Sequence, residues 1–187
     1  MHYIGTIIAL YIYIQIISKG IHSNEEEYLM SDKELFNKDL VFLDYEVTDR
    51  NDFFTKISKL MFEKGYVTTS FYEAITTREG NYPTGLQTET IGVAIPHTDP
   101  ENLKKPFIAV IRPKKEIEFE PMGMTEGLVK AKLIFVLGVL RDGGQVKVLQ
   151  KLMYMLMNET AVNKLLNANE NENVIEIIDE FFENVEI

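Results

Sequence analysis

The sequence predicts one α/β domain, with a mixed central sheet flanked by helices on both faces. A chain of 187 residues suits a single domain with a sizeable core. Apolar segments of strand length and segments with helical periodicity follow one another as strand, two helices, several strands and then helices. Residues 133–140 form an almost continuous apolar run, which is typical of a strand buried on both faces. We see no internal repeat or low-complexity linker that would divide the chain.

In the first half of the domain, we expect a short edge strand at residues 39–43. A helix should follow over 52–64, where apolar side chains recur at the helical period. Asp49 or Asn51 can cap its start, and Gly65 is a suitable terminator. A second helix should run from Ser70 to about Thr77.

The second half begins with a glycine-containing loop at 80–85. The expected strands are 91–95, 107–111, a half-exposed 116–119 and the buried run at 133–140. A helix of about fourteen residues should start near Gln145. Two further amphipathic helices are expected at 161–166 and 174–182.

The composition excludes several classes of function. The net charge of −10 argues against a nucleic-acid surface, which would require a basic stripe, so no nucleic-acid partner is expected. The chain has no cysteine, which excludes thiol catalysis, disulfides and thiolate metal sites. A chain without cysteine also fits the cytoplasm.

The first thirty residues differ from the rest. Residues 3–17 are nearly all apolar, but the run is shorter than the roughly 18 residues of a spanning helix and has no basic segment before it. A membrane anchor, a signal peptide and a mis-assigned start are the alternatives. Residues 24–30 could be encoded by a purine-rich run shortly before an ATG, the form of a bacterial ribosome-binding site. We therefore expect 1–29 to be a leader outside the native protein, which would start at Met30 and form its domain over 30–187.

His97 is the candidate reactive residue. It follows Pro96, which cannot continue a central strand, so the imidazole should lie at the carboxyl end of a strand, where open α/β sheets place their chemistry. His97 and Asp99 have a ligand-like spacing, but no second histidine after Met30 completes a metal set, so neither a metal nor a cofactor is expected. General-base catalysis would need a nucleophile or an acidic partner that the sequence does not identify. A nucleophilic imidazole needs one neutral nitrogen facing solvent and the other held by a hydrogen bond.

The residues after His97 allow two interpretations. Thr98 or Asp99 can cap a short helix with Pro100 at its first position, and free amides there would suit a phosphate. Alternatively, Asp99 and Pro100 form only a turn.

The motifs around His97 resemble a known family. Arg78-Glu79, then Thr84-Gly85-Leu86, then the run GVAIPH over 92–97 are similar to the type-2 (fructose/mannitol-type) EIIA domain of the bacterial sugar phosphotransferase system (PTS). The segments 117–119, 122–123 and 133–137 resemble its galactitol-type branch. The resemblance covers about residues 38–182.

The resemblance implies a phosphoryl relay in the cytoplasm. His97 would take a phosphoryl group from the phosphocarrier HPr and pass it to a cysteine of a partner EIIB, which serves a membrane EIIC during sugar uptake. Arg78 would stabilise the phosphate, since a guanidinium suits phosphate oxygens. Many members carry a second histidine where this chain has Gln145, whose amide can donate a hydrogen bond but cannot titrate.

Two other functions remain as alternatives. One is a regulatory relative, in which phosphorylation of His97 signals to another protein. The other is a non-catalytic α/β binding domain with an inert His97. The resemblance leaves the sugar and the oligomeric state open, and Glu79 is equally compatible with a surface ion pair and a functional role.

Overall fold

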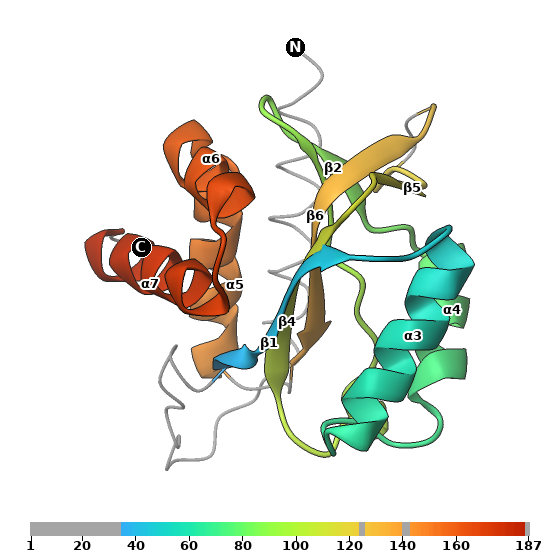
Figure 1. Ribbon diagram of the computed structural model, residues 1–187. Helices are drawn as coiled ribbons and strands as arrows, with labels where there is room; N and C mark the ends of the chain where they lie inside the picture. Colours follow the sequence, from blue (N-terminus) through green and yellow to red (C-terminus); the bar gives the residue numbers. More distant parts are fainter. Residues whose placement is uncertain (1–34, 124–125, 140–142, 186–187) are drawn as a thin grey trace.

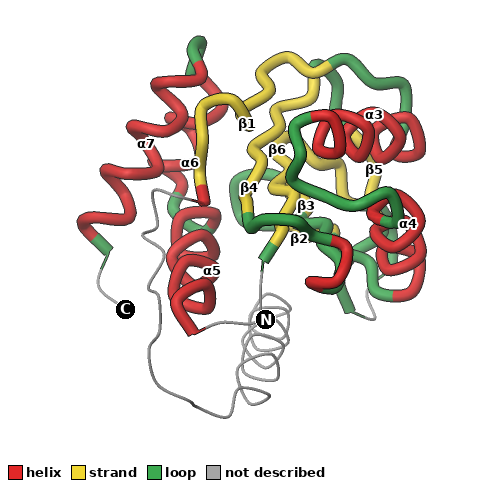
Figure 2. Tube along the Cα trace, turned by 90° about the horizontal axis from the view of Figure 1, so that it is seen from below, coloured by secondary structure: helices red, strands yellow, loops and turns green. Residues whose placement is uncertain are grey.

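The computed structural model describes residues 35–123, 126–139 and 143–185 (Figure 1). The predicted leader at 1–29 and the predicted start at Met30 lie outside these ranges. A six-stranded mixed sheet has helices on both of its faces, which confirms the predicted architecture (Figures 1 and 2). None of the described helices is long and apolar enough to cross a membrane.

The sheet has the strand order β1-β4-β6-β3-β2, and β5 pairs with β6 outside this path. Pairs β1/β4 and β3/β6 are parallel, and the other pairs are antiparallel. The strands are β1 (Phe36–Tyr45), β2 (Gly85–Gln87), β3 (Gly92–Ala94), β4 (Phe107–Pro113), β5 (Ile117–Phe119) and β6 (Val129–Gly138).

The helices form one layer on each side of the sheet (Figure 2). On one face lie α3 (Arg50–Glu63) and α4 (Phe71–Asn81), and on the other lie α5 (Gly143–Leu156), α6 (Glu159–Asn167) and α7 (Asn171–Asn184). The side chains of β6 alternate between the two cores: Leu133 and Phe135 pack on the α5–α7 side, and Ile134 and Val136 on the α3–α4 side. This alternation follows from the strand's period of about two residues. The prediction of a central buried strand is confirmed, although β6 starts earlier than expected, at Val129, and ends at Gly138.

The first predicted helix is confirmed as α3. The Asp49 carboxylate accepts a hydrogen bond from the Asp52 amide at 2.9 Å and caps the helix. Gly65 follows its end with a φ of 75°, a conformation that glycine adopts without strain. Phe53, with 0% exposure, belongs to the apolar stripe that faces the sheet.

Two predictions were wrong in the segment that joins α4 to β2, namely the end of the helix and the extent of the loop. We expected a helix to about Thr77 and a loop at 80–85, but α4 continues to Asn81 and β2 begins at Gly85. The strand β2 has three residues, and its conformation depends on antiparallel pairing with β3 rather than on an apolar pattern of its own. The longer α4 places Arg78 in its last turn instead of after the helix.

The last described helix closes the sheet edge that the first described strand leaves open. The Asn171 amide group donates to the carbonyls of Val41 at 2.9 Å and Lys38 at 3.1 Å. Phe182 of α7 packs edge-on against Phe36, with 5.5 Å between ring centroids. These contacts hold α7 against β1, which is an edge strand of the sheet.

Candidate active site

His97 lies at the carboxyl end of β3, beside the end of β6. Its backbone bridges Leu137 in parallel, and the Leu137 amide donates to the Pro96 carbonyl at 3.0 Å. Because β3 and β6 are parallel, their carboxyl ends meet at this edge of the sheet. The predicted placement of the imidazole is confirmed.

The two ring nitrogens of His97 have different partners. Nδ1 lies 2.9 Å from the Ile95 carbonyl oxygen, which can only accept, so Nδ1 carries the proton. The lone pair is then on Nε2, which lies 2.6 Å from Nη2 of Arg78. One nitrogen is thus held by the backbone, while the other carries the lone pair and is directed at Arg78.

The surroundings keep this ring neutral. Burial, followed by the positive charge of Arg78, lowers the pKa of the His97 imidazole from its ordinary 6.5 to about 4. The Ile95 carbonyl and Asp99 act in the opposite direction with smaller effects. At neutral pH, His97 therefore presents an uncharged nitrogen without first losing a proton.

Arg78 reaches His97 from the last turn of α4. Its guanidinium carbon also lies 5.4 Å from the centre of the Tyr82 ring, in cation–π geometry. A guanidinium beside Nε2 disfavours a positively charged imidazole but attracts a phosphoryl group at the same point. The sequence-predicted pair of Arg78 and His97 is brought together in the structure.

Gln145, the third predicted site residue, belongs to the first turn of α5. Its side chain is not among those that the structure describes, so its predicted hydrogen bond to phosphate stays a prediction.

The residues after His97 form a turn. Pro100–Asn102 is a single 3-10 turn, and the Asp99 side chain makes no capping hydrogen bond to it. The predicted short helix is present as this single turn, with Asp99 at the N-cap position and Pro100 at the first position. The predicted binding of phosphate at its start stays a prediction.

Asn102, which is 7% exposed, ties this turn to the start of α4. Its Oδ1 accepts from the Ser70 hydroxyl at 2.6 Å, and its Nδ2 donates to the Thr98 hydroxyl at 3.3 Å. The sequence analysis missed this residue, since an asparagine in a polar loop carries no signal of burial.

Glu79, whose role the sequence left open between a surface ion pair and a functional group, is buried, with 3% exposure. Both of its oxygens accept hydrogen bonds from Thr84. The adjacent Arg78-Glu79 and Thr84-Gly85 motifs were visible in the sequence, but only the fold shows that Glu79 and Thr84 are in contact.

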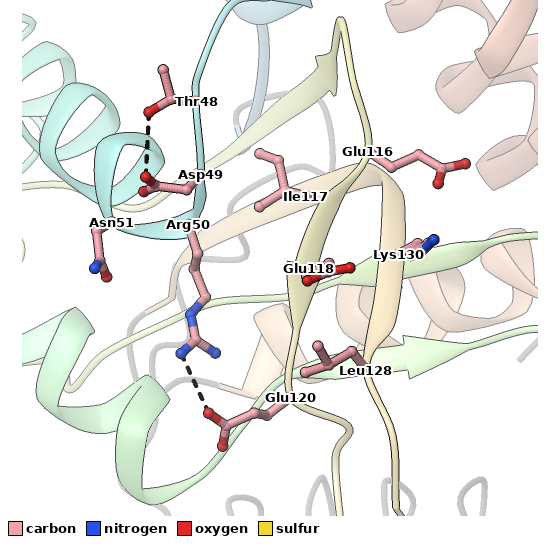
Figure 3. Close-up of a pocket in the computed structure, with 10 residues that line it drawn as sticks. All are labelled: Thr48, Asp49, Arg50, Asn51, Glu116, Ile117, Glu118, Glu120, Leu128 and Lys130. Atoms are coloured by element: carbon pink, nitrogen blue, oxygen red, sulfur yellow. Dashed lines mark hydrogen bonds and ion pairs between the residues drawn. The ribbon is translucent and has the colours of Figure 1, made fainter.

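Two hollows lie beside the helices α3 and α4. One, of about 500 Å³, lies between the start of α3 and β5, where Arg50 pairs with Glu120 at 3.3 Å (Figure 3). The other, of about 410 Å³, borders Arg78 and lies between α4 and the turn after His97. Of these two, the second is the one beside the reactive pair. Across the described ranges, no three His, Cys, Asp or Glu side chains gather as a metal-ligand set.

The comparisons with known proteins agree with this geometry. The family described as "Phosphoenolpyruvate-dependent sugar phosphotransferase system, EIIA 2" matches residues 34–181. The chain belongs to this EIIA type-2 family. It is an EIIA component of a sugar phosphotransferase system, working through a phosphohistidine intermediate, which excludes the non-catalytic alternative.

The chain is similar to one characterised relative in sequence and to two solved structures in fold. The galactitol-specific EIIA component of Escherichia coli strain K12 is 29% identical over 124 residues, which are 66% of this chain and 82% of that protein. The nitrogen regulatory protein IIA-Ntr of Neisseria meningitidis is 25% identical with a TM-score of 0.66, covering 78% of this chain and 97% of that one. The mannitol IIA in a complex with phosphorylated mannitol IIB from E. coli has a TM-score of 0.63 at 18% identity, covering 78% and 99%.

Proposed function

We propose that His97 is the phosphoryl acceptor of this EIIA component. The observation that carries the proposal is the neutral imidazole with Nδ1 bound to the Ile95 carbonyl and Nε2 directed at Arg78. Nucleophilic phosphoryl acceptance requires a neutral nitrogen held in position.

The transfer proceeds by displacement at phosphorus. The Nε2 lone pair forms the N–P bond while the bond from phosphorus to the donor atom of phospho-HPr breaks and leaves its electron pair on HPr. The Ile95 carbonyl accepts the hydrogen bond of Nδ1 throughout and favours the positive charge that develops on the ring. Arg78 exchanges its contact with Nε2 for contacts with the phosphoryl oxygens.

The second step passes the group onward. A thiolate of EIIB attacks phosphorus, the P–S bond forms, and the electron pair of the N–P bond returns to Nε2. None of the 187 residues is a cysteine, so the thiol that receives the group belongs to EIIB and not to this sequence. The mannitol IIA with the same fold forms a complex with its phosphorylated IIB, which supports EIIB as a partner. We place the protein in the cytoplasm, where it acts between HPr and the EIIB that serves a membrane EIIC.

Gln145 is proposed as an additional donor to the bound phosphoryl group. Its position in the first turn of α5, the helix that follows β6, supports this role. Replacing it by Ala should slow acceptance without changing its pH dependence, because an amide does not titrate. An unchanged rate would remove Gln145 from the site.

The experiment is a labelling assay with enzyme I, HPr and radioactive phosphoenolpyruvate. Wild type should acquire one acid-labile phosphate, and His97→Ala should acquire none. The matched control is the double variant His2→Ala, His22→Ala, which removes the other two histidines and should label normally. Label that persists in His97→Ala would contradict the assignment.

A regulatory role is the second candidate, supported by the similarity to the nitrogen regulatory protein IIA-Ntr. In that case, the phosphorylated state of His97 would be the signal. Adding EIIB proteins to the labelled chain separates the two functions. Rapid loss of label to an EIIB cysteine supports transport, and stable label with every EIIB supports regulation.

A further inference from the structure

Glu79 is a buried carboxylate that the proposed transfer does not use. It lies in the last turn of α4, where only 3% of it is exposed. Its Oε1 accepts from the Thr84 amide at 3.0 Å, and its Oε2 accepts from the Thr84 hydroxyl at 2.7 Å. We name these two hydrogen bonds the Glu79–Thr84 clamp.

Burying the Glu79 carboxylate costs free energy, because the charged group is removed from water. Burial raises the pKa of the Glu79 carboxyl, and the hydrogen bonds from Thr84 oppose this rise. An apolar side chain would fill the same space without removing a carboxylate from water. Stability alone therefore does not account for a carboxylate here.

On one side, the clamp leads to the His97 ring. The Thr84 carbonyl accepts from the Ile95 amide at 3.3 Å, and the Ile95 carbonyl accepts from Nδ1 of His97 at 2.9 Å. Thr84 immediately precedes β2, which pairs with β3 up to Ala94. Two residues, Thr84 and Ile95, thus connect the Glu79 carboxylate through hydrogen bonds to the nitrogen that sets the tautomer of His97.

On the other side, the clamp leads to Arg78. Glu79 is the next residue in the same helical turn, so fixing its side chain fixes the end of α4 from which Arg78 extends to Nε2. The helix and the strand that carry the reactive pair are joined at this point by one carboxylate.

We propose that Glu79 is a positioning residue for phosphoryl transfer, which through Thr84 sets the relative placement of Arg78 and His97. This inference rests on the proposed function, because it assumes that Nε2 receives the phosphoryl group. Glu79 contacts no reacting atom, so its effect is on the geometry in which Arg78 and the ring meet. Small displacements of such groups reduce transfer rates strongly.

The variants remove the clamp and then restore it. Glu79→Met keeps the length of the side chain but cannot accept from Thr84. Glu79→Gln keeps an acceptor for the Thr84 amide. Thr84→Val removes the hydroxyl donor, and Thr84→Ser restores it. The matched control is Thr88→Val at the other end of β2, since Thr88 is also buried but bonds to Ile91 instead of Glu79.

The readouts are single-turnover acceptance from phospho-HPr and the NMR titration of the His97 ring. Glu79→Met and Thr84→Val should lower the rate at saturating phospho-HPr about tenfold without raising the half-saturating concentration. Glu79→Gln and Thr84→Ser should recover most of this rate. The His97 midpoint should move from about 4 toward 6.5 in Glu79→Met, as the ring and Arg78 separate.

The outcomes separate the inference from the proposed function. If wild type accepts no phosphate on His97, the proposed function fails. If wild type accepts phosphate and a folded Glu79→Met does so equally fast with an unmoved His97 midpoint, the positioning role is overturned. If Glu79→Met does not fold, Thr84→Val decides by the same criteria. An equal loss in Thr88→Val would also overturn it, because the hairpin rather than the clamp would then be responsible.

Discussion

Protonation of His97 should cost the folded protein a measurable part of its stability. The unfolded chain binds a proton on this residue near pH 6.5, whereas the native ring binds it only near pH 4. Between these values the unfolded state carries more protons, so the free energy of unfolding falls as the pH falls. The two pKa values differ by about 2.5, and a difference of one pKa unit corresponds to about 1.4 kcal/mol. The largest expected loss in the free energy of unfolding is therefore about 3 kcal/mol.

The assay compares wild type with His97→Gln, which does not titrate. Urea unfolding of both proteins at pH 7.5, 6.5, 5.5 and 4.5 should show that wild type loses stability relative to the variant across the window from about 6.5 to about 4. Carboxyl groups also titrate in part of this window, but they are common to both proteins and cancel in the difference. NMR of the imidazole gives the midpoint directly, and the variant identifies the signal among those of the other histidines.

Two results would refute this reasoning. Parallel stability curves would mean that the native ring protonates as easily as the unfolded one. An imidazole midpoint near 6.5 would mean that neither burial nor Arg78 acts on the ring as the structure implies.

Three further predictions concern the site and its scaffold. Arg78→Ala should slow phosphoryl acceptance about 100-fold in the single-turnover assay. Arg78→Lys keeps the charge but not the planar guanidinium, so it should recover part of the lost rate. Equal rates in wild type and both variants would contradict the role of the guanidinium. Gly138→Ala should lower the free energy of unfolding by about 1–3 kcal/mol in urea, because its methyl group would lie 2.3 Å from the Phe107 ring; an unchanged midpoint would show that the ring moves freely. Phe53→Ala should cost about 3–5 kcal/mol, since this side chain is fully buried between α3 and the sheet, while Lys38→Ala on the surface should change the urea midpoint little; similar losses in both variants would contradict the placement of the core.

The elements that could be predicted are those with a strong local pattern. The sequence of α3 shows an apolar residue at each helical turn, a capping residue before its start and a glycine after its end. The sequence of β6 contains a long apolar run, which is typical of a central strand buried on both faces. In contrast, β2 is three residues long and depends on its partner strand. The end of α4 was misplaced because Gly80 and Asn81 are typical loop residues, whereas Glu79 anchors this turn through a bond to Thr84.

The candidate site was predictable to a different extent. His97 and Arg78 could be named from motifs. Because they are 19 positions apart, the sequence does not show that their side chains meet, and the contact of 2.6 Å between Nη2 and Nε2 is a property of the fold. Asn102 was missed, and the role of Glu79 was left open, because burial of a polar side chain is decided by tertiary packing. The tautomer of His97 likewise follows from the Ile95 carbonyl, which no side-chain pattern reveals.

The closure of β1 by α7 has a consequence for synthesis on the ribosome. The Asn171 side chain donates to a backbone carbonyl of β1 and the Phe182 ring packs on Phe36 of β1, more than a hundred residues earlier in the chain. Strand β1 therefore leaves the exit tunnel early, and its contacts with α7 cannot form until α7 has also been synthesised. Nascent chains halted before Asn171 should be digested rapidly by protease around β1, and chains released after Asn184 should resist it. In the part of the chain that the structure describes, the last helix therefore docks onto the first strand late in synthesis.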